Sequence, residues 1–257
     1  MTALRYAVSD TLVLAKRSFL RIPRQPDLLV GFTIQPVMFV LLFVYVLGGA
    51  IATPGFDYVD FLMPGILVQS MAFGGFVTAL GLAEDLKKGL IDRFRSLPMA
   101  RSAVLTGRTL ADVATNVIQL VVMLAVGLAV GFRFSSSVPE VVAGIVLLLL
   151  IGYAFSWVFA FIGLVSSSPE AANAYGFTII FPLTFVSSAF VPVQSMPSWL
   201  QPFAEHNPVT AMVDAVRALF LGIPAGNSVW LAVGWSFALI AVFGGLSSWR
   251  YRRAVGR

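Results

Sequence analysis

The sequence predicts an all-α membrane protein with six transmembrane helices, an amphipathic N-terminal helix at the membrane interface, and external re-entrant helices between spans five and six. The first reason is composition: 58% of the 257 residues are hydrophobic and 11% are charged, whereas soluble domains have about 45–50% apolar and about 25% charged residues. The second reason is that the charges lie in connections between long apolar runs. A soluble enzyme, a nucleic-acid-binding protein and a disordered chain are therefore excluded, and the net charge of +5 reflects membrane topology.

Six apolar stretches are long enough to cross a bilayer, which takes about 20 residues. The connections between most of them are short, so we expect one membrane domain that covers residues 1–257. The predicted spans are residues 28–47, 61–82, 110–130, 141–161, 171–190 and 229–246.

The lysine and arginine residues predict the orientation of these spans. Of the 17 basic residues, all but two lie in the N-terminal arm, in the connection between spans two and three, and in the C-terminal tail. The two exceptions, Arg133 and Arg217, lie on the opposite side of a six-span protein. Because cytoplasmic connections are enriched in basic residues, we expect a multi-pass protein of the cell (plasma or inner) membrane with both termini in the cytoplasm.

The N-terminal arm, residues 1–27, is the first element outside the spans. Leu4, Val8, Leu12, Ala15 and Phe19 recur at intervals of three to four residues, with polar side chains on the opposite side. This period is typical of an amphipathic helix that lies in the cytoplasmic interface. Such a helix either only anchors the chain or also contacts a partner, and the sequence leaves both possibilities open.

The most charged stretch of the chain, residues 84–108, connects spans two and three. Leu86, Leu90 and Phe94 fall on one helical face at intervals of four, and Pro98 then ends the helix. A connection that only joined two spans could be much shorter. The stretch is therefore either a solvated charge run that sets the topology or a docking element for a soluble partner.

The connection between spans five and six, residues 191–224, contains five prolines and two helix patterns. A short helix is predicted around Trp199, and a second one begins at Asn207, with the asparagine as cap and a proline in the first helical position. Asp214 and Arg217, three residues apart on the second helix, are expected to form an ion pair. Two short helices here indicate a re-entrant segment, which is tolerated where protein or water surrounds it.

Motifs for most catalytic chemistry are absent from the sequence. There is no G-x-x-x-x-G-K-[ST] loop for ATP phosphates and no G-x-S-x-G nucleophile motif. Cysteine is absent and His206 is the only histidine, which excludes zinc and thiol chemistry. No pair of carboxylates lies at mid-membrane, which argues against an ion-coupled carrier. Asp112, Asn116 and Gln119 form a polar stripe that rises from the cytoplasmic end of the third span.

Aromatic and polar residues recur along the first, second and fifth spans. Phe177, Phe181 and Phe185 are four residues apart, and Pro182 kinks their helix. One interpretation is ordinary helix packing or lipid contact. The other is a pathway for a bulky apolar or amphiphilic solute, lined by Gln35, Phe39, Gln69, Phe177, Phe181, Thr184 and Phe185.

Two stretches carry a resemblance to a known family. The first is Glu84-Asp-Leu-Lys-Lys-Gly-Leu-Ile-Asp-Arg-Phe-Arg-Ser-Leu-Pro-Met, followed by Gly107-Arg108. The second is Phe190-Val-Pro-Val-Gln-Ser-Met-Pro-Ser-Trp-Leu, continued by Asn207-Pro208 and Asp214-Ala-Val-Arg217-Ala. They resemble, respectively, the cytoplasmic coupling segment and the external re-entrant helices of the ABC-2 family of ABC-exporter membrane subunits, in particular the daunorubicin-resistance type of permease. With six spans and an amphipathic arm, the likeness covers essentially the whole chain.

The resemblance implies half of a transporter and not an enzyme. A second permease subunit, either a copy or a relative, would pair with this chain, and two separate ABC ATPase subunits would bind ATP and Mg beneath them. This chain would itself hold no cofactor and no metal. Contacts with the ATPases are expected at Glu84, Asp85, Leu86, Lys87, Lys88, Gly89, Leu90 and Phe94. The external helices would include Trp199, Asn207, Pro208, Asp214 and Arg217.

The expected activity is ATP-driven export of a hydrophobic or amphiphilic small molecule, such as a drug, an antibiotic or a lipid. The alternative within the family is a polysaccharide or glycolipid exporter, which a path lined by phenylalanine disfavours. Rivals from other classes are an ion-coupled carrier and a membrane-bound enzyme that would have to use Glu205, His206 and Asp214. A gene for a P-loop ATPase beside this one would decide between the exporter and these rivals.

Overall fold

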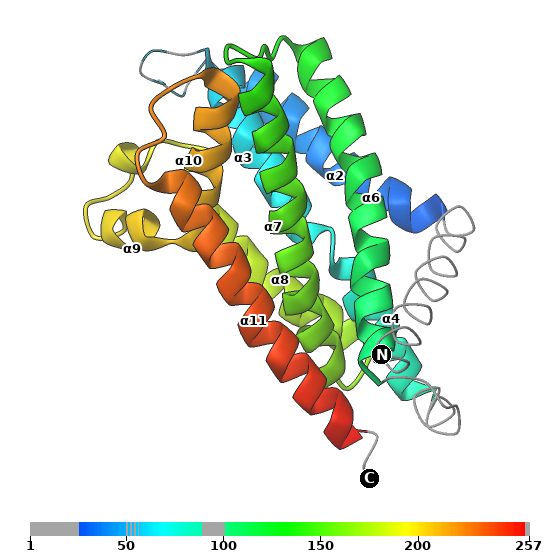
Figure 1. Ribbon diagram of the computed structural model, residues 1–257. Coiled ribbons are helices and arrows are strands. Elements are labelled where there is room, and N and C mark those ends of the chain that lie inside the picture. Colours follow the sequence, from blue (N-terminus) through cyan, green and yellow to red (C-terminus); the bar gives the residue numbers. More distant parts are fainter. Residues whose placement is uncertain are drawn as a thin grey trace.

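The computed structural model describes residues 26–49, 51, 53, 55, 57–88 and 101–254 (Figure 1). This part of the chain is helical and contains no strand. Most of the predicted amphipathic arm, and the predicted contact residues Gly89, Leu90 and Phe94, lie outside the described residues. The helices are α2 (Pro26–Leu41), the π-helix η2 (Leu42–Leu47), α3 (Tyr58–Phe73), α4 (Phe76–Lys87), α6 (Arg101–Val130), α7 (Val138–Val165), α8 (Pro169–Phe185), the 3-10 turn η3 (Val193–Ser195), α9 (Gln201–His206), α10 (Pro208–Leu221) and α11 (Ser228–Ala254).

Four helical stretches of the described chain are long and apolar enough to cross a membrane. They are Tyr58–Lys87, Leu105–Val130, Val138–Val165 and Ser228–Tyr251, and they coincide with predicted spans two, three, four and six. Three of them extend beyond both boundaries expected from the sequence, and the stretch that ends at Val130 extends only at its start. The first predicted span corresponds to α2 and η2, whose apolar part, Ile34–Leu47, is shorter.

The predicted fifth span is also shorter than expected, because α8 ends at Phe185 and not at residue 190. The Ser187 hydroxyl donates to the carbonyl oxygen of Thr184, and the backbone N–H of Ala189 donates back to the Ser187 hydroxyl. Serine side chains that bond to nearby backbone in this way compete with helix continuation. The chain therefore leaves the helix there and turns toward η3 and α9.

The second predicted span is broken at Gly74 and Gly75, between α3 and α4. This break was not predicted from the sequence. A methyl group on Gly75 would lie 2.8 Å from the Cα atom of Ser156 on α7. The chain at the break therefore approaches α7 so closely that a side chain at this position would force the two elements apart.

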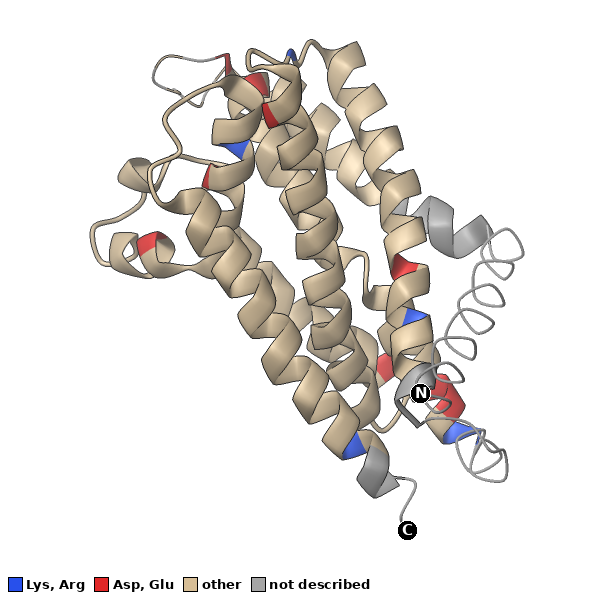
Figure 2. Cartoon of the chain, viewed as in Figure 1, with Lys and Arg blue, Asp and Glu red and all other residues tan. Residues whose placement is uncertain are grey.

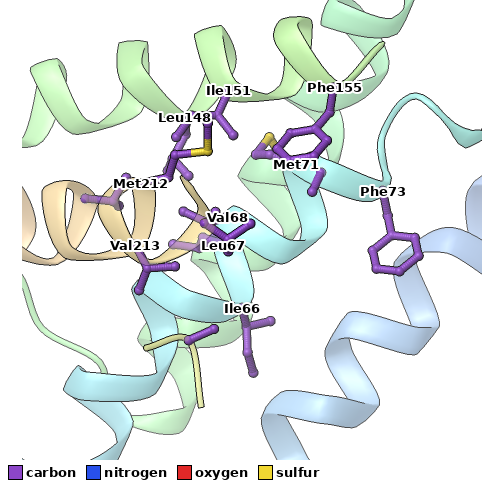
Figure 3. Packing of buried hydrophobic residues seen from close by; sticks show 14 of the residues in the cluster. Ile66, Leu67, Val68, Met71, Phe73, Leu148, Ile151, Phe155, Met212 and Val213 are labelled. Carbon is purple, nitrogen blue, oxygen red and sulfur yellow. The ribbon is translucent and has the colours of Figure 1, made fainter. Parts of the chain in front are cut away.

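The core lies where α3, α7 and α10 meet. All but two residues of α3 are buried, and the close view in Figure 3 shows side chains from the three helices in contact. Because α3 is enclosed on all sides, its sequence is apolar around the whole helix and has no separate polar face. The labelled contacts join Ile66, Leu67, Val68 and Met71 of α3 with Leu148, Ile151 and Phe155 of α7 and Met212 and Val213 of α10.

Charged residues gather toward the two ends of the bundle, and the length between the ends is almost free of them, with α6 and α9 as exceptions (Figure 2). One end brings together the end of α4 and the C-terminal end of α11 (Figure 1). Helix α11 packs on α7 and α10 but is otherwise largely exposed and apolar. This is the distribution expected of a multi-pass membrane protein.

Candidate functional site

The three predicted phenylalanines of α8 form a continuous stack of rings. The ring centroids of Phe177 and Phe181 are 5.2 Å apart and those of Phe181 and Phe185 are 5.6 Å apart. The interval of four residues places the three side chains above one another along one face of the helix. The sequence therefore encodes a column of aromatic rings, in which stacking adds to the burial of each ring.

Tertiary contacts extend this column at both ends. At one end the Phe177 ring meets Phe73 and Phe76, which flank the break between α3 and α4, at centroid distances of 5.8 and 5.0 Å. At the other end the Phe185 ring contacts Phe39 of α2 at 6.4 Å and stacks on Phe190 at 4.7 Å. We call this set the phenylalanine column. It comprises Phe39, Phe73, Phe76, Phe177, Phe181, Phe185 and Phe190.

The predicted pathway residues thus separate into two groups. Phe177 and Phe181 are half-buried and Phe185 is 41% exposed, so the α8 part of the column lies at the surface of the single chain. Phe73, Phe76 and Phe190 are buried behind it. Gln69 and Thr184 are buried beneath it, where the Gln69 amide Nε2 donates to the Thr184 hydroxyl over 3.3 Å. Gln35 is half-buried on α2. Sequence analysis did not assign Phe73 and Phe76 to this group, since only the fold brings the helix break next to α8.

Asn207 joins the end of α8 to the start of α10. Its side-chain oxygen accepts a hydrogen bond from Val209 N, as expected of a helix cap. Its amide nitrogen donates to the carbonyl oxygens of Leu183 and Val186, at 2.7 and 2.5 Å. Carbonyl groups at a helix C-terminus have no partner within the helix. The predicted Asn207–Pro208 helix start is confirmed, and one side chain satisfies the ends of two helices.

The first external helix begins later than predicted. Trp199 lies in the turn before α9, which starts at Gln201, and its side chain is exposed. The Gln201 side chain donates to the carbonyl oxygens of Gln194 and Met196 and so closes this turn. The three prolines around the turn disfavour an earlier helix start, because each removes one backbone donor.

Arg217 connects α10 with two distant parts of the chain. The predicted pair with Asp214 is confirmed, with 2.7 Å between Nη1 and Oδ1. However, Arg217 is only 6% exposed. Its remaining nitrogens donate to the carbonyl oxygens of Phe61, at 3.1 and 3.2 Å, and Ser188, at 2.7 Å. Burial lowers the pKa of Arg217 to about 10, so the guanidinium remains charged at neutral pH.

The described part of the predicted coupling segment is the last turn of α4. Glu84 pairs with Lys88 within this turn. Asp85 pairs with Arg108 of α6 over 2.6 Å and thereby joins the two ends of the segment. The exposed Lys87 and Lys88 lie at the end of the helix.

Leu86 differs from its neighbours in this turn. Its side chain packs against a buried cluster that includes Leu82, Trp157 and Tyr251. The apolar face predicted from Leu86 is therefore directed at least partly into this chain.

Comparison with known proteins identifies the family. Residues 9–221 match the profile of the family described as ABC-2 type transporter. The chain belongs to this family. It is 35% identical over 246 residues to the daunorubicin resistance ABC transporter permease protein DrrB1 of Streptomyces coeruleorubidus, a match that covers 96% of this chain and 87% of the relative. It is 26% identical over 253 residues to the probable doxorubicin resistance permease DrrC of Mycobacterium tuberculosis, with 98% and 91% covered.

A third relative is the putative transport permease ycf38 of Cyanophora paradoxa, which is 27% identical over 230 residues, with 88% and 77% covered. Family membership confirms that this chain is a transport subunit of the permease type and not an enzyme. It also implies that an ABC ATPase is its partner. The predicted resemblance is therefore confirmed.

Proposed function

We propose that this chain is the membrane-spanning permease subunit of an ATP-driven exporter of hydrophobic or amphiphilic small molecules, such as planar aromatic drugs or lipids. The phenylalanine column is the observation that carries this proposal. It offers an apolar, aromatic surface with few hydrogen-bonding groups, which suits stacking with a flat hydrophobic solute. The same surface disfavours long sugars, which need many hydrogen-bond partners. The names of the daunorubicin and doxorubicin resistance relatives agree with it.

Replacement of Phe181 by alanine is the test of this role. Phe181 lies in the middle of the stack, so its loss separates Phe177 from Phe185. We expect the concentration of daunorubicin that half-maximally stimulates ATP hydrolysis to rise about tenfold, which corresponds to the loss of one aromatic contact of about 1–1.5 kcal/mol. The measurement is drug-stimulated ATPase activity of the reconstituted permease and ATPase.

The matched control is Phe161→Ala. Phe161 is also half-buried, but its ring pairs with Phe243 of α11, away from the column. This variant should keep the wild-type response to each solute. Equal responses of the Phe181 and Phe161 variants to a panel of drugs and lipids would contradict the pathway.

The proposed topology has six spans, with both termini and residues 84–108 in the cytoplasm. The asymmetry of the basic residues supports it, as does the presence of the end of α4 and the C-terminal end of α11 at the same end of the bundle (Figure 1). In this topology α8 is the fifth span, and α9 and α10 form the external re-entrant segment. Reporter fusions at Ser135 and Gly256 should be external and cytoplasmic, respectively. The opposite location of either reporter would contradict six spans.

The proposed assembly contains two ABC ATPase subunits, which hold ATP and Mg, and a second permease subunit, identical or related. Residues 84–95 would transmit the ATPase movement to the membrane. The Asp85–Arg108 ion pair supports this role, because it ties the end of α4 to α6, so that a displacement of one helix also moves the other.

A further inference from the structure

A group of polar side chains lies inside the bundle, apart from the phenylalanine column. Asp112 and Asn116, both on α6, are 6% and 0% exposed. The Thr78 hydroxyl of α4 donates to Asp112 Oδ1 over 2.9 Å. The Ser156 hydroxyl of α7 lies beside the same carboxylate. Three helices therefore bring a carboxylate, an amide and two hydroxyls to one buried place, which we call the α6 polar site.

This site lies deeper than the sequence suggested. The predicted third span began at residue 110, which put Asp112 at its cytoplasmic end. Helix α6 in fact begins at Arg101. At 1.5 Å per residue, Asp112 is about 16 Å beyond that point. Ionisable residues that are buried within membrane helices are costly and are retained mainly where they have a function.

Three polar atoms of the site have no hydrogen-bond partner among the described residues: Asp112 Oδ2, Asn116 Oδ1 and Asn116 Nδ2. Buried polar groups are nearly always hydrogen-bonded, and a buried charge is paired or coordinates a metal. Arg108, four residues before Asp112 on α6, is bound to Asp85 over 2.6 Å. Among the described residues Asp112 forms no ion pair of its own.

The position of Asn116 shows that the backbone is built around this group. A methyl group on Gly74 would lie 1.8 Å from Asn116 Oδ1, and one on Gly152 would lie 2.5 Å from Asn116 Nδ2. Only glycine leaves room for the amide on these two sides. The amide thus sits at the break between α3 and α4, and interrupted membrane helices are characteristic of coupling-ion sites in transporters.

We propose that the α6 polar site binds one Na⁺ ion. Asp112 Oδ2 and Asn116 Oδ1 would supply two oxygen ligands. Thr78 and Ser156 would supply hydroxyl oxygens, since their protons are donated to Asp112 Oδ1 and to the carbonyl oxygen of Gly152 and each hydroxyl keeps a free lone pair. All ligands are hard oxygens, and the single charge of the ion balances the carboxylate. The ion would hold α4, α6 and α7 together next to the helix break.

The test is thermal unfolding of the full-length chain in lipid nanodiscs, in NaCl and in choline chloride of equal ionic strength, together with equilibrium binding of ²²Na⁺. We expect the melting temperature to rise with NaCl until the site is saturated, because a ligand that binds only the folded state stabilises it. We also expect one bound ²²Na⁺ per chain. Choline is too large for the site and should have no effect beyond ionic strength.

Asp112→Asn is the decisive variant, because it keeps the shape of the side chain and removes its charge. It should lose ²²Na⁺ binding and the NaCl response, and in choline chloride it should be at least as stable as the wild type. The control Asp57→Asn makes the same change at an exposed position whose side chain makes no cap hydrogen bond, and it should keep both responses. Thr78→Val should shift the response to higher NaCl concentration.

Several outcomes would overturn this proposal. Equal melting temperatures in both salts, with no bound ²²Na⁺, would mean that water occupies the site. Stability that depends on pH through Asp112 but not on Na⁺ would mean that the carboxyl is protonated instead. A full NaCl response in Asp112→Asn would place the ion elsewhere. None of these measurements requires transport, so they are independent of the proposed export function.

Discussion

Arg217→Met is expected to destabilise the external half of the protein by about 2–6 kcal/mol, because two buried carbonyl oxygens lose their donors. Asp214 is 44% exposed, so water compensates much of its lost partner. The larger part of the cost comes from the carbonyl oxygens of Phe61 and Ser188, which lose buried donors worth about 1–3 kcal/mol each. The result should be a large fall in melting temperature and in the amount of folded protein in the membrane.

Lysine at position 217 should rescue little of this loss. A single ammonium group cannot reproduce the fork of donors that reaches Asp214, Phe61 and Ser188 together. The control is Arg133→Met. Arg133 is exposed, and its side chain donates hydrogen bonds to the nearby backbone carbonyl oxygens of Leu128 and Phe132. Its effect should stay near 1 kcal/mol. Equal melting temperatures of the two methionine variants would show that the Arg217 contacts do not stabilise the fold.

Leu86→Asp is expected to weaken the coupling between ATP hydrolysis and export. The aspartate would place a carboxylate against the cluster that contains Leu82 and Trp157. The loss of a partly buried leucine contributes about 1–2 kcal/mol, and the charge adds a desolvation cost. The end of α4 should therefore detach from α7 and α11, and the drug-dependent part of ATP hydrolysis should fall about 5–30-fold.

Lys87→Ala is the matched control, because Lys87 is the next residue and is exposed. Surface substitutions of this kind usually change stability by less than about 0.5 kcal/mol. Co-purification of the ATPase, drug-stimulated ATP hydrolysis and export should be measured for both variants. Normal ATPase binding and normal export in Leu86→Asp would show that residues 84–88 set the topology and do not transmit the ATPase movement.

The Leu86 experiment also separates two physical explanations. Sequence periodicity placed Leu86 on a face for docking a soluble partner, whereas the structure directs it at least partly into this chain. A drop in the melting temperature of the isolated permease would assign the effect to internal packing. A loss of ATPase binding without such a drop would assign it to docking.

The sequence alone determined the features that depend on residues close together in the chain. Apolar runs predicted the four helical stretches that are long enough to cross a membrane, Asn207 and Pro208 predicted a helix start, and the interval of three predicted the Asp214–Arg217 pair. The interval of four placed the phenylalanines of α8 on one face of the helix, where they stack. These features could be read because helix geometry fixes which neighbours meet within a turn or two.

The tertiary structure decided everything that joins distant positions. Arg217 reaches Phe61, which is 156 residues away, and this contact turns an expected surface pair into a buried link. Gln69 meets Thr184 across 115 residues, and the polar stripe from Asp112 to Asn116 is buried against α4 and α7. The membrane makes such contacts hard to foresee, because lipid-facing and core-facing residues are both apolar and the pattern does not distinguish the two faces of a helix. Only packing shows which polar side chains are enclosed together.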